Sequence, residues 1–337
     1  MTMHLARVRR RRIGWLIPLL LISAAAIAIV VMQVQSAGVS LNAPVLLPPT
    51  PTPSITPRPT ATQLPTATPR PMTAKAERAP TVTSPLPTPA PTIIVPPAPL
   101  LPPVSDGVKR TANVPILMYH YISVPPSSSD RLRVGLSVPP DMFESQMKLL
   151  IDNGFHTISL FDLYEHLAIG KPLPDKPIIL TFDDGYVDNY TNAFPILKKY
   201  GLTATFFVLT GRLDEGDPVY MTWDMIKEMS AAGLDIQLHS RAHVDLRRRD
   251  YDYLFFQLYG GRQSIEGHTG KPVVFIAYPS GKYDEAVLRF LTTHHFWAAL
   301  TTNPGQTHTL NDALTWARVR VSGQLTLDGF AKALGIK

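Results

Sequence analysis

The chain has 337 residues, of which 34 are proline and none is cysteine. The absence of cysteine excludes disulfides, thiolate ligands, a cysteine nucleophile and a lipidated N-terminal cysteine. A metal must therefore be held by His, Asp or Glu. The net charge of +6 comes from residues 1–105, which carry nine Lys or Arg and one acidic residue. Residues 106–337 carry 23 Lys or Arg and 25 Asp or Glu. The nearly neutral second part argues against a nucleic-acid partner, and no segment predicts a protein partner.

The N-terminal segment has the pattern of a membrane anchor. Residues 1–12 contain five arginines, and residues 13–34 begin with an uncharged apolar run of the ~20 residues that cross a bilayer. Because positive charge stays in the cytoplasm, we expect a cytoplasmic segment over 1–12 and a transmembrane signal anchor over 13–34. The alternative is a signal peptide cleaved near the small residues at 35–38. The first case predicts a single-pass protein of the cell membrane with an extracytoplasmic domain, and the second a secreted protein.

Residues 35–105 are predicted to be a linker. This stretch is rich in Pro, Thr, Ala and Ser, and 20 of the 34 prolines lie between Pro44 and Pro103. Proline at this density breaks helix and sheet and favours extended polyproline II over a buried core. The linker is therefore expected to be a disordered, proline-rich stalk that acts as a spacer, and a tail without any length requirement is the alternative.

Residues 106–337 alternate apolar runs with amphipathic stretches. The expected strands are 114–121, 178–182, 203–209, 234–238, 273–278, 297–300 and 318–321. The expected helices are 141–153, 189–200, 222–232, 284–293 and 327–334. Alternation of strands and helices indicates parallel pairing with right-handed crossovers, so the predicted fold is α/β, a distorted (β/α) barrel with about seven strands.

Two short motifs follow predicted strands, where barrel enzymes place their catalytic groups. Asp183 and Asp184 come directly after the strand at 178–182, although two acids before a glycine also suit a surface turn. His239 and His243 follow another strand and could reach one ion across a helical turn, or both could face solvent. Together, Asp184, His239 and His243 form a two-histidine, one-carboxylate set that suits a catalytic zinc or similar ion. A glycosidase pair is disfavoured because adjacent strand residues diverge.

With these motifs the sequence resembles the polysaccharide deacetylases of the NodB-homology group, carbohydrate esterase family 4, from about residue 114 to 337. The resemblance rests on residues 181–185 and 239–243, supported by residues 118–120, 277–281 and 301–305. It implies that Asp183 is the general base and that Asp184, His239 and His243 hold a divalent metal, most often zinc, with cobalt, nickel or manganese as alternatives.

The resemblance also implies a substrate site beside the metal. The backbone N–H of Ser280 would be an oxyanion donor, and Tyr278 and Pro279 would belong to the substrate-binding segment. His120 ends the first strand, where it could face the metal site and bind substrate, or close the barrel mouth by hydrogen bonding.

Two departures from the family pattern affect the expected mechanism. Many members carry Arg where this chain has Ala277, which leaves Asp183 without that orienting partner, although one branch has Ala there. The Leu-x-His segment that usually supplies the general acid is missing, so the acid is unassigned and His308 is a weak candidate. Arg318 or Arg320 could orient a carboxylate instead.

The expected function is metal-dependent removal of acetyl groups from N-acetylglucosamine units of peptidoglycan or an exopolysaccharide, with release of acetate. The expected partners are thus a glycan polymer and, through residues 13–34, a membrane. A catalytically silent glycan-binding module on the same fold is the main alternative, motivated by Ala277 and the missing histidine. A hydrolase of another amide or ester is a third hypothesis.

Overall fold

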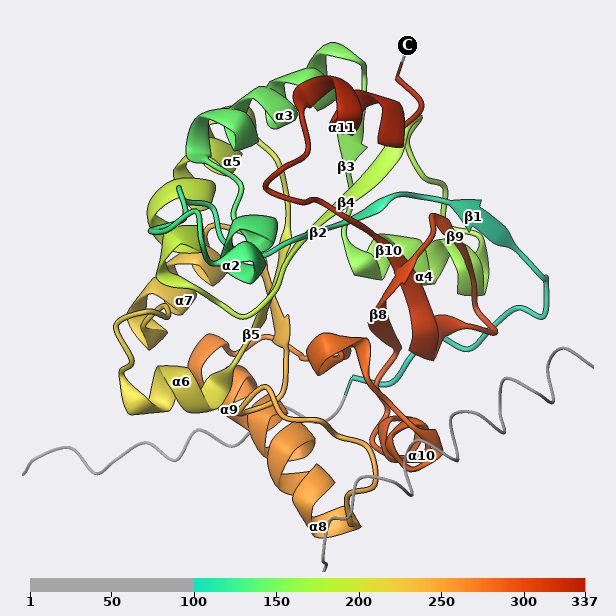
Figure 1. The fold of residues 1–337 in the computed structure, drawn as a ribbon. Helices are drawn as coiled ribbons and strands as arrows, with labels where there is room; N and C mark the ends of the chain where they lie inside the picture. The colour runs from blue at the N-terminus through green and yellow to red at the C-terminus, as the bar shows by residue number, and fades with distance from the viewer. Residues whose placement is uncertain (1–99, 337) are drawn as a thin grey trace, which may run out of the picture. The chain divides into compact units, whose positions relative to one another are not determined.

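The computed structural model describes residues 100–336 (Figure 1). The predicted cytoplasmic segment 1–12, the predicted anchor 13–34 and nearly all of the predicted linker 35–105 lie outside the described residues. Among residues 100–336, no helix combines the length and apolar character needed to cross a membrane.

Seven parallel strands form a closed barrel. They are β2 (Ile116–Tyr119), β4 (Pro177–Phe182), β5 (Thr205–Val208), β6 (Asp235–Leu238), β7 (Phe275–Ala277), β8 (Ala298–Pro304) and β10 (Trp316–Arg320). The order is β2-β10-β8-β7-β6-β5-β4, and β2 pairs again with β4, which closes the sheet. Because all these pairings are parallel, the carboxyl ends of the strands meet at one mouth. The predicted barrel of about seven strands is confirmed.

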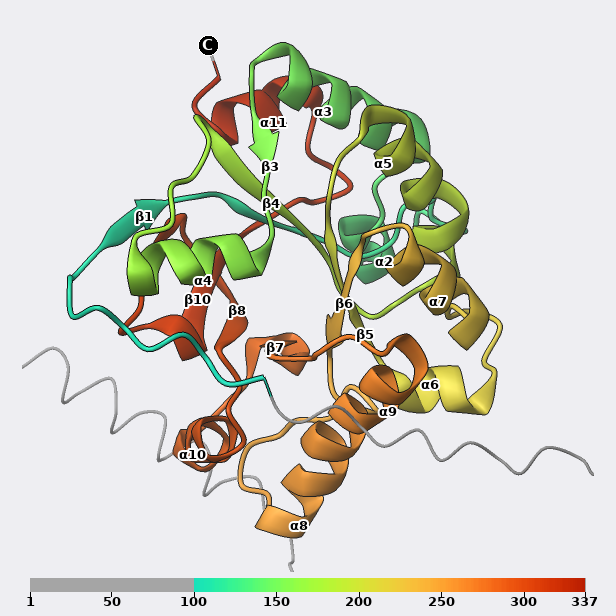
Figure 2. The ribbon, with the colours of Figure 1, turned by 180° about the vertical axis from the view of Figure 1, so that it is seen from behind.

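Helices surround the strands (Figures 1 and 2). The longer ones are α3 (Pro140–Asp152), α4 (Leu160–Ile169), α7 (Trp223–Ala231), α9 (Gly260–Thr269) and α10 (Glu285–Thr293), with shorter α2 (Arg131–Leu136), α5 (Phe194–Tyr200), α6 (Thr210–Glu215), α8 (Tyr251–Leu254) and α11 (Leu327–Ala333). In both views α11 lies beside α3, so the C-terminal helix packs against the first long helix. Three short strands complete the fold: β3 (His156–Thr157) extends the sheet beside β4, and β1 (Thr111–Asn113) pairs antiparallel with β9 (Thr307–Thr309).

The helix predicted over 189–200 is not regular. It begins with a π-helical turn, η1 (Asn189–Ala193), in which the Phe194 N–H donates to the Asn189 carbonyl five residues earlier. The α-helix α5 follows, and its second residue is Pro195. Proline has no N–H for the bond to residue i−4 and crowds that carbonyl, so the wider turn in front of it relieves the mismatch.

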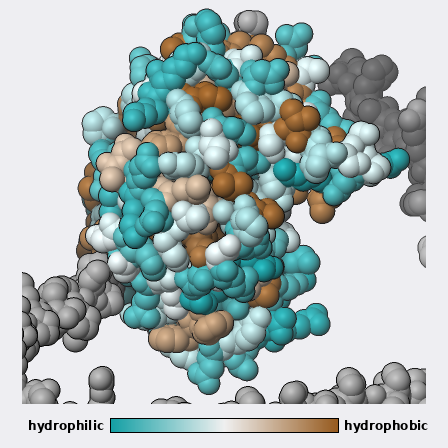
Figure 3. Space-filling view, turned by 90° about the vertical axis from the view of Figure 1, so that its left-hand side faces the viewer, coloured by the Kyte–Doolittle hydropathy of each residue, from teal (hydrophilic) through white to brown (hydrophobic). Residues whose placement is uncertain are grey.

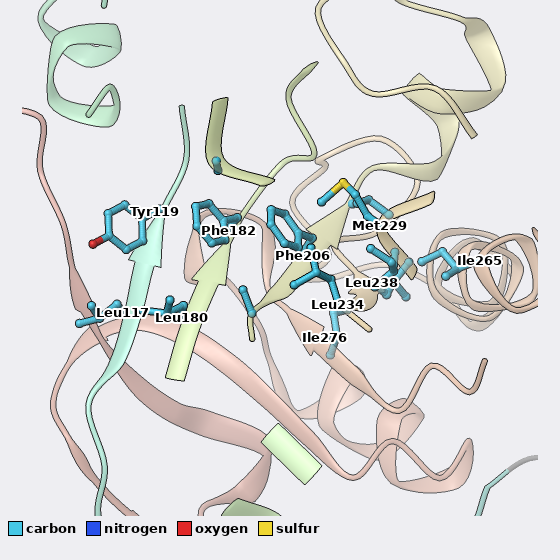
Figure 4. Close-up of a cluster of buried hydrophobic side chains, with 14 of the residues drawn as sticks. Leu117, Tyr119, Leu180, Phe182, Phe206, Met229, Leu234, Leu238, Ile265 and Ile276 are labelled. Atoms are coloured by element: carbon cyan, nitrogen blue, oxygen red, sulfur yellow. The ribbon is translucent and has the colours of Figure 1, made fainter. Parts of the chain in front are cut away.

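The two faces of the barrel wall support two apolar clusters, because successive strand residues point to opposite sides. On the helix-facing side the Phe182 and Phe206 rings stack with centroids 4.6 Å apart, and Tyr119 stacks on Phe182 at 5.2 Å (Figure 4). The neighbouring residue Phe207 belongs to the second cluster, which also contains Trp316 and the buried side chains of α4. Both faces of the strands are therefore buried, as expected for a parallel sheet.

The described chain begins at the end of the barrel where the strands start. Trp297 directly precedes β8, and its indole N–H donates to the Leu100 carbonyl at 2.9 Å. The same indole packs against Phe161 and Tyr164 of α4, with ring centroids 5.3 and 5.2 Å away. Residue 100 and α4 thus mark the end opposite the mouth.

The surface is mostly polar on the face that carries α5, α6 and α7. Hydrophilic side chains cover most of it, and hydrophobic residues are scattered among them (Figure 3). Single exposed apolar side chains are ordinary for a globular domain and require no partner to explain them.

Replacing Phe206 by Ala should lower the free energy of unfolding by about 3–5 kcal/mol, because it removes a fully buried ring from the stacked cluster. Chemical denaturation of the full-length protein measures this loss. Phe256→Ala is the matched control, since that ring is 58% exposed. Equal stabilities of the two variants would contradict the assignment of the cluster to the core.

Candidate functional site

The two aspartates lie at the carboxyl end of β4. The Asp183 N–H still donates to the Tyr119 carbonyl of β2 at 2.9 Å, so this residue continues the strand. Asp184 and Gly185 then turn with φ of +75° and +77°. A Cβ at residue 185 would lie 3.1–3.2 Å from the Val208 side chain, so the close approach to β5 favours glycine there. This turn separates the directions of the two carboxylates.

The two histidines come from a bent loop after β6, and the expected helical turn between them is not formed. Ser240 and His243 adopt left-handed conformations, with φ of +69° and +52°. The Ser240 hydroxyl accepts the His243 N–H at 3.1 Å, and the Gln257 side-chain carbonyl accepts the N–H groups of residues 241 and 242 at 3.2 Å each. These hydrogen bonds replace those of a helix and hold both imidazoles on one side of the loop.

Asp184, His239 and His243 converge on one point. The Asp184 Oδ1 lies 3.3 Å from His239 Nε2 and 3.5 Å from His243 Nε2, and the three ligand atoms lie within 4.8 Å of one another. His239 Nδ1 contacts the Ala277 carbonyl at 2.7 Å, which assigns the ring proton to Nδ1 and leaves the lone pair of Nε2 facing the carboxylate. Two acceptors at this distance require a shared cation or proton.

The electrostatics of this cluster fit a divalent cation. Within the described residues the buried Asp184 Oδ1 has no hydrogen-bond donor. Burial alone would lower the pKa of His239, but its close contact with Asp184 and the charges of Asp183 and Asp184 outweigh burial, so the pKa is raised. The cluster therefore attracts positive charge at the point where a metal would bind, and one carboxylate with two imidazoles is a donor set typical of catalytic zinc.

Asp183 is held by a buried arginine from the other side of the barrel. Arg318 Nη1 and Nη2 donate to Asp183 Oδ1 and Oδ2 at 2.8 and 2.7 Å, and both residues are almost fully buried. Arg318 also donates to the Thr301 carbonyl and to the Thr181 hydroxyl. Burial would raise the pKa of Asp183, but the charges of Arg318 and His239 lower it well below its usual range. The carboxylate left without a partner by Ala277 is therefore oriented by Arg318.

A cleft of about 540 Å³ opens over these residues. His120, Tyr278 and Ser280 line it, together with the two aspartates and both histidines, so the predicted substrate residues lie at the mouth. Pro279 is instead buried within η3 (Pro279–Gly281). Burial lowers the pKa of His120 to about 4, although Asp183 and Asp184 act in the opposite direction. His120 thus offers the cleft a neutral imidazole.

The turn at Ser280 lies in the lining of the cleft, and this residue is exposed. Ser280 has φ of +55°, while the next two N–H groups, of Gly281 and Lys282, bond to the carbonyls of Tyr278 and Pro279. Of the seven non-glycine residues with positive φ in the described chain, four are at this site: Asp184, Ser240, His243 and Ser280. Such conformations persist only where the surrounding structure enforces them.

His308 does not join the site, so its assignment as a general acid is wrong. It lies in β9, where its Nε2 contacts the Val114 carbonyl at 3.0 Å and its ring lies edge-on to Trp316. Because β9 pairs with β1 outside the barrel, its side chain is buried between the two-stranded sheet and the barrel wall, away from the residues that line the cleft.

Sequence reasoning missed an aromatic wall beside the cleft. Tyr186 and Tyr220 line the cleft and stack on each other with centroids 5.2 Å apart, and Tyr121 stacks behind Tyr186. These tyrosines come from loops that are far apart in the sequence, so no periodic pattern indicates them. Only the position of Tyr186, directly after the aspartate turn, gave a usable signal.

Comparison with known proteins agrees with this geometry. The family model described as polysaccharide deacetylase matches residues 170–297. The Bacillus subtilis protein YxkH, which carries the name of a polysaccharide deacetylase, is 32% identical over 222 residues, covering 66% of this chain and 76% of that relative. The chain belongs to the polysaccharide deacetylase family. Members are hydrolases that act on carbon–nitrogen bonds and generally depend on a divalent metal.

Two further matches extend the comparison. The solved structure of the Streptococcus pyogenes deacetylase PplD in complex with acetate is 31% identical, with a TM-score of 0.61 over 67% of this chain and 98% of that structure. A poly-beta-1,6-N-acetyl-D-glucosamine N-deacetylase from Staphylococcus aureus is 36% identical over 130 residues, which are 37% of this chain and 43% of that enzyme. The deacetylase fold is thus matched along nearly the whole of PplD, whereas the match to the Staphylococcus enzyme spans less than half of its length.

The full-length protein should bind one zinc or cobalt ion through Asp184, His239 and His243, as measured by calorimetric titration. His239→Ala should weaken binding at least tenfold, because it removes one of three ligands. His156→Ala is the control, since that imidazole is exposed and contacts the Asp175 carbonyl. Affinity should fall as the pH is lowered through the raised pKa of His239, because protons compete for Nε2. Unchanged binding by His239→Ala would exclude this site.

Arg318→Ala should destabilise the protein by about 3–5 kcal/mol, because it leaves the Asp183 carboxylate buried without its partner. Thermal or chemical unfolding at pH 7 measures the loss. The control Arg320→Ala, two residues along the same strand, should change stability little because that side chain is exposed. Equal effects of the two substitutions would contradict the structural role of the Arg318 pair.

Proposed function

We propose that the protein is a zinc-dependent N-deacetylase that hydrolyses acetamide groups of an N-acetylglucosamine-containing polysaccharide, either peptidoglycan or an exopolysaccharide, and releases acetate. One observation carries the proposal: the carboxylate of Asp183, fixed by Arg318, lies beside the ligand set of Asp184, His239 and His243 in one open cleft. A base next to a metal site is what hydrolysis of an unreactive amide requires. The Staphylococcus aureus relative acts, by its name, on such a polymer.

Asp183 would act as the base. Asp184, His239 and His243 would hold a divalent ion, which would supply Lewis-acid chemistry to the water and the acetamide carbonyl. Both Asp183 oxygens already accept from Arg318, but a carboxylate has further lone pairs, one of which can accept the proton of the attacking water. Once it holds that proton, Asp183 can return it to the leaving nitrogen, so one carboxyl group would serve first as base and then as acid.

Two other groups would bind the reacting acetamide. The Ser280 N–H would donate to the oxygen that becomes negative in the tetrahedral intermediate, because Ser280 lines the cleft in a left-handed turn. His120, neutral at pH 7, can donate one N–H to the sugar or to the amide. With Asp183 able to carry the proton in both directions, the missing Leu-x-His segment does not leave the reaction without an acid.

Two alternatives remain distinct from this proposal. A catalytically silent glycan-binding module was motivated by Ala277, and the pairing of Asp183 with Arg318 weakens that motive. A hydrolase of another amide or ester would use the same groups on a different substrate.

We also propose that the domain works outside the cell, tethered through residues 13–34, because the basic segment and the apolar run have the order of a signal anchor.

The test is acetate release by the full-length protein from chitooligosaccharides, peptidoglycan and poly-N-acetylglucosamine, with added zinc or cobalt. We expect metal-dependent release that a chelator abolishes, and a loss of at least a hundredfold in kcat for Asp183→Asn, because the amide cannot act as a base. Calorimetry should show that the variant still binds metal. Metal and glycan binding without acetate release from any substrate would favour the silent module.

A further inference from the structure

Two arginines that the proposed chemistry does not use line the cleft. Arg320 ends β10, and Arg212 lies in α6 on another part of the lining. Arg318 and Arg320 are two residues apart on one strand, so they point to the same side, with Arg318 inside the barrel and Arg320 one step nearer the mouth. Arg320 is in register with Met118 of the adjacent strand β2, and His120 follows two residues later. Arg320 therefore stands beside the imidazole assigned to the substrate.

The charge of Arg320 is not compensated within the described part of the chain. Arg318 is paired with Asp183, and Arg212 pairs with Glu215 at 3.0 Å in an exposed contact that is easily exchanged. Among residues 100–336 no ion pair and no side-chain hydrogen bond involves Arg320. The two carboxylates of the lining are both engaged, Asp183 by Arg318 and Asp184 by the histidines. Arg320 is thus a cation of the cleft lining that has no partner in the described part of the chain, in a domain whose sequence is nearly neutral.

The rest of the wall does not select for charge. Tyr186 and Tyr220 offer stacked aromatic rings, which suit the faces of any sugar. A guanidinium, in contrast, matches the geometry of a carboxylate and can donate two parallel hydrogen bonds to it. A group of that kind on the substrate would meet Arg320 while the acetamide lies at the metal site.

We propose that Arg320, with Arg212 as a second positive group, forms a subsite for a carboxylate carried by the glycan close to the reacting acetamide. The substrate class is then an acidic glycan, in which the acetamido sugar or its neighbour bears a free carboxylate, such as a lactyl ether or a uronic acid. A neutral polymer of N-acetylglucosamine is the poorer substrate. The inference rests on the proposed deacetylase function, which places the sugar in the cleft.

The test compares matched glycans on the full-length, metal-loaded protein. In the first pair, one glycan carries free carboxylates: it is a peptide-free strand of alternating N-acetylglucosamine and N-acetylmuramic acid. The second is the same strand with its carboxyl groups reduced to alcohols. A uronic-acid-containing acetylated oligosaccharide and a chitooligosaccharide of equal length form a second pair, which distinguishes the two sources of carboxylate. Acetate release gives kcat/KM, and calorimetry gives affinity.

The variants are Arg320→Gln, Arg320→Lys and the control Arg289→Gln, which removes an exposed charge from α10. We expect kcat/KM to be higher for the carboxylate member, and Arg320→Gln to lower it about fivefold to tenfold through KM, since an exposed charged hydrogen bond is lost. The neutral member should respond little, Arg320→Lys should restore part of the effect, and Arg289→Gln should change nothing. Added salt should reduce the preference in the wild type.

The outcomes separate this inference from the proposed function. Equal kcat/KM for both members of each pair, unaffected by Arg320→Gln, would overturn the carboxylate subsite and leave the deacetylase standing. Absence of acetate release from all glycans, with affinity for the carboxylate members that depends on Arg320, would overturn the deacetylase and support the subsite in a glycan-binding module. A loss in Arg320→Gln that is equal for neutral and acidic glycans would show a general structural effect and contradict the inference.

Discussion

The bidentate pair between Arg318 and Asp183 is the interaction on which the rest of the site depends. Its guanidinium reaches from β10 to β4, strands that are not neighbours, and donates also to the Thr301 carbonyl of β8. The pair therefore links three strands across the barrel interior. A buried ion pair of this kind is tolerated because its charged groups are hydrogen-bonded, and in return it keeps the Asp183 carboxylate ionised without water.

Rigid strands and strained loops have complementary roles here. The strands place the site residues at the mouth, and the loops then adopt left-handed conformations at four positions, three of them at or between the proposed metal ligands. Backbone in this region costs free energy, so the hydrogen bonds from Gln257 and Ser240 and the packing of Gly185 against β5 must hold it. The stability of the barrel thus offsets the conformational strain of the loops that form the site.

Most of the barrel could be predicted because both faces of its strands are buried, which gives each strand a short, continuous apolar run. The aspartate and histidine motifs were readable for the same reason, since each follows such a run directly. The partner of Asp183 could not be predicted from the sequence, because Arg318 lies 135 residues away and only barrel closure brings the two residues together. His308 was misassigned because sequence order does not reveal that β9 leaves the barrel to pair with β1.

The contact between Trp297 and Leu100 has a geometric consequence for any tethered form of the protein. The chain enters the domain at the end where the strands begin, while the cleft lies at the end where they finish. An attachment made through the preceding residues would therefore join the domain at the end opposite the cleft, and the attachment point itself would not obstruct access to the cleft.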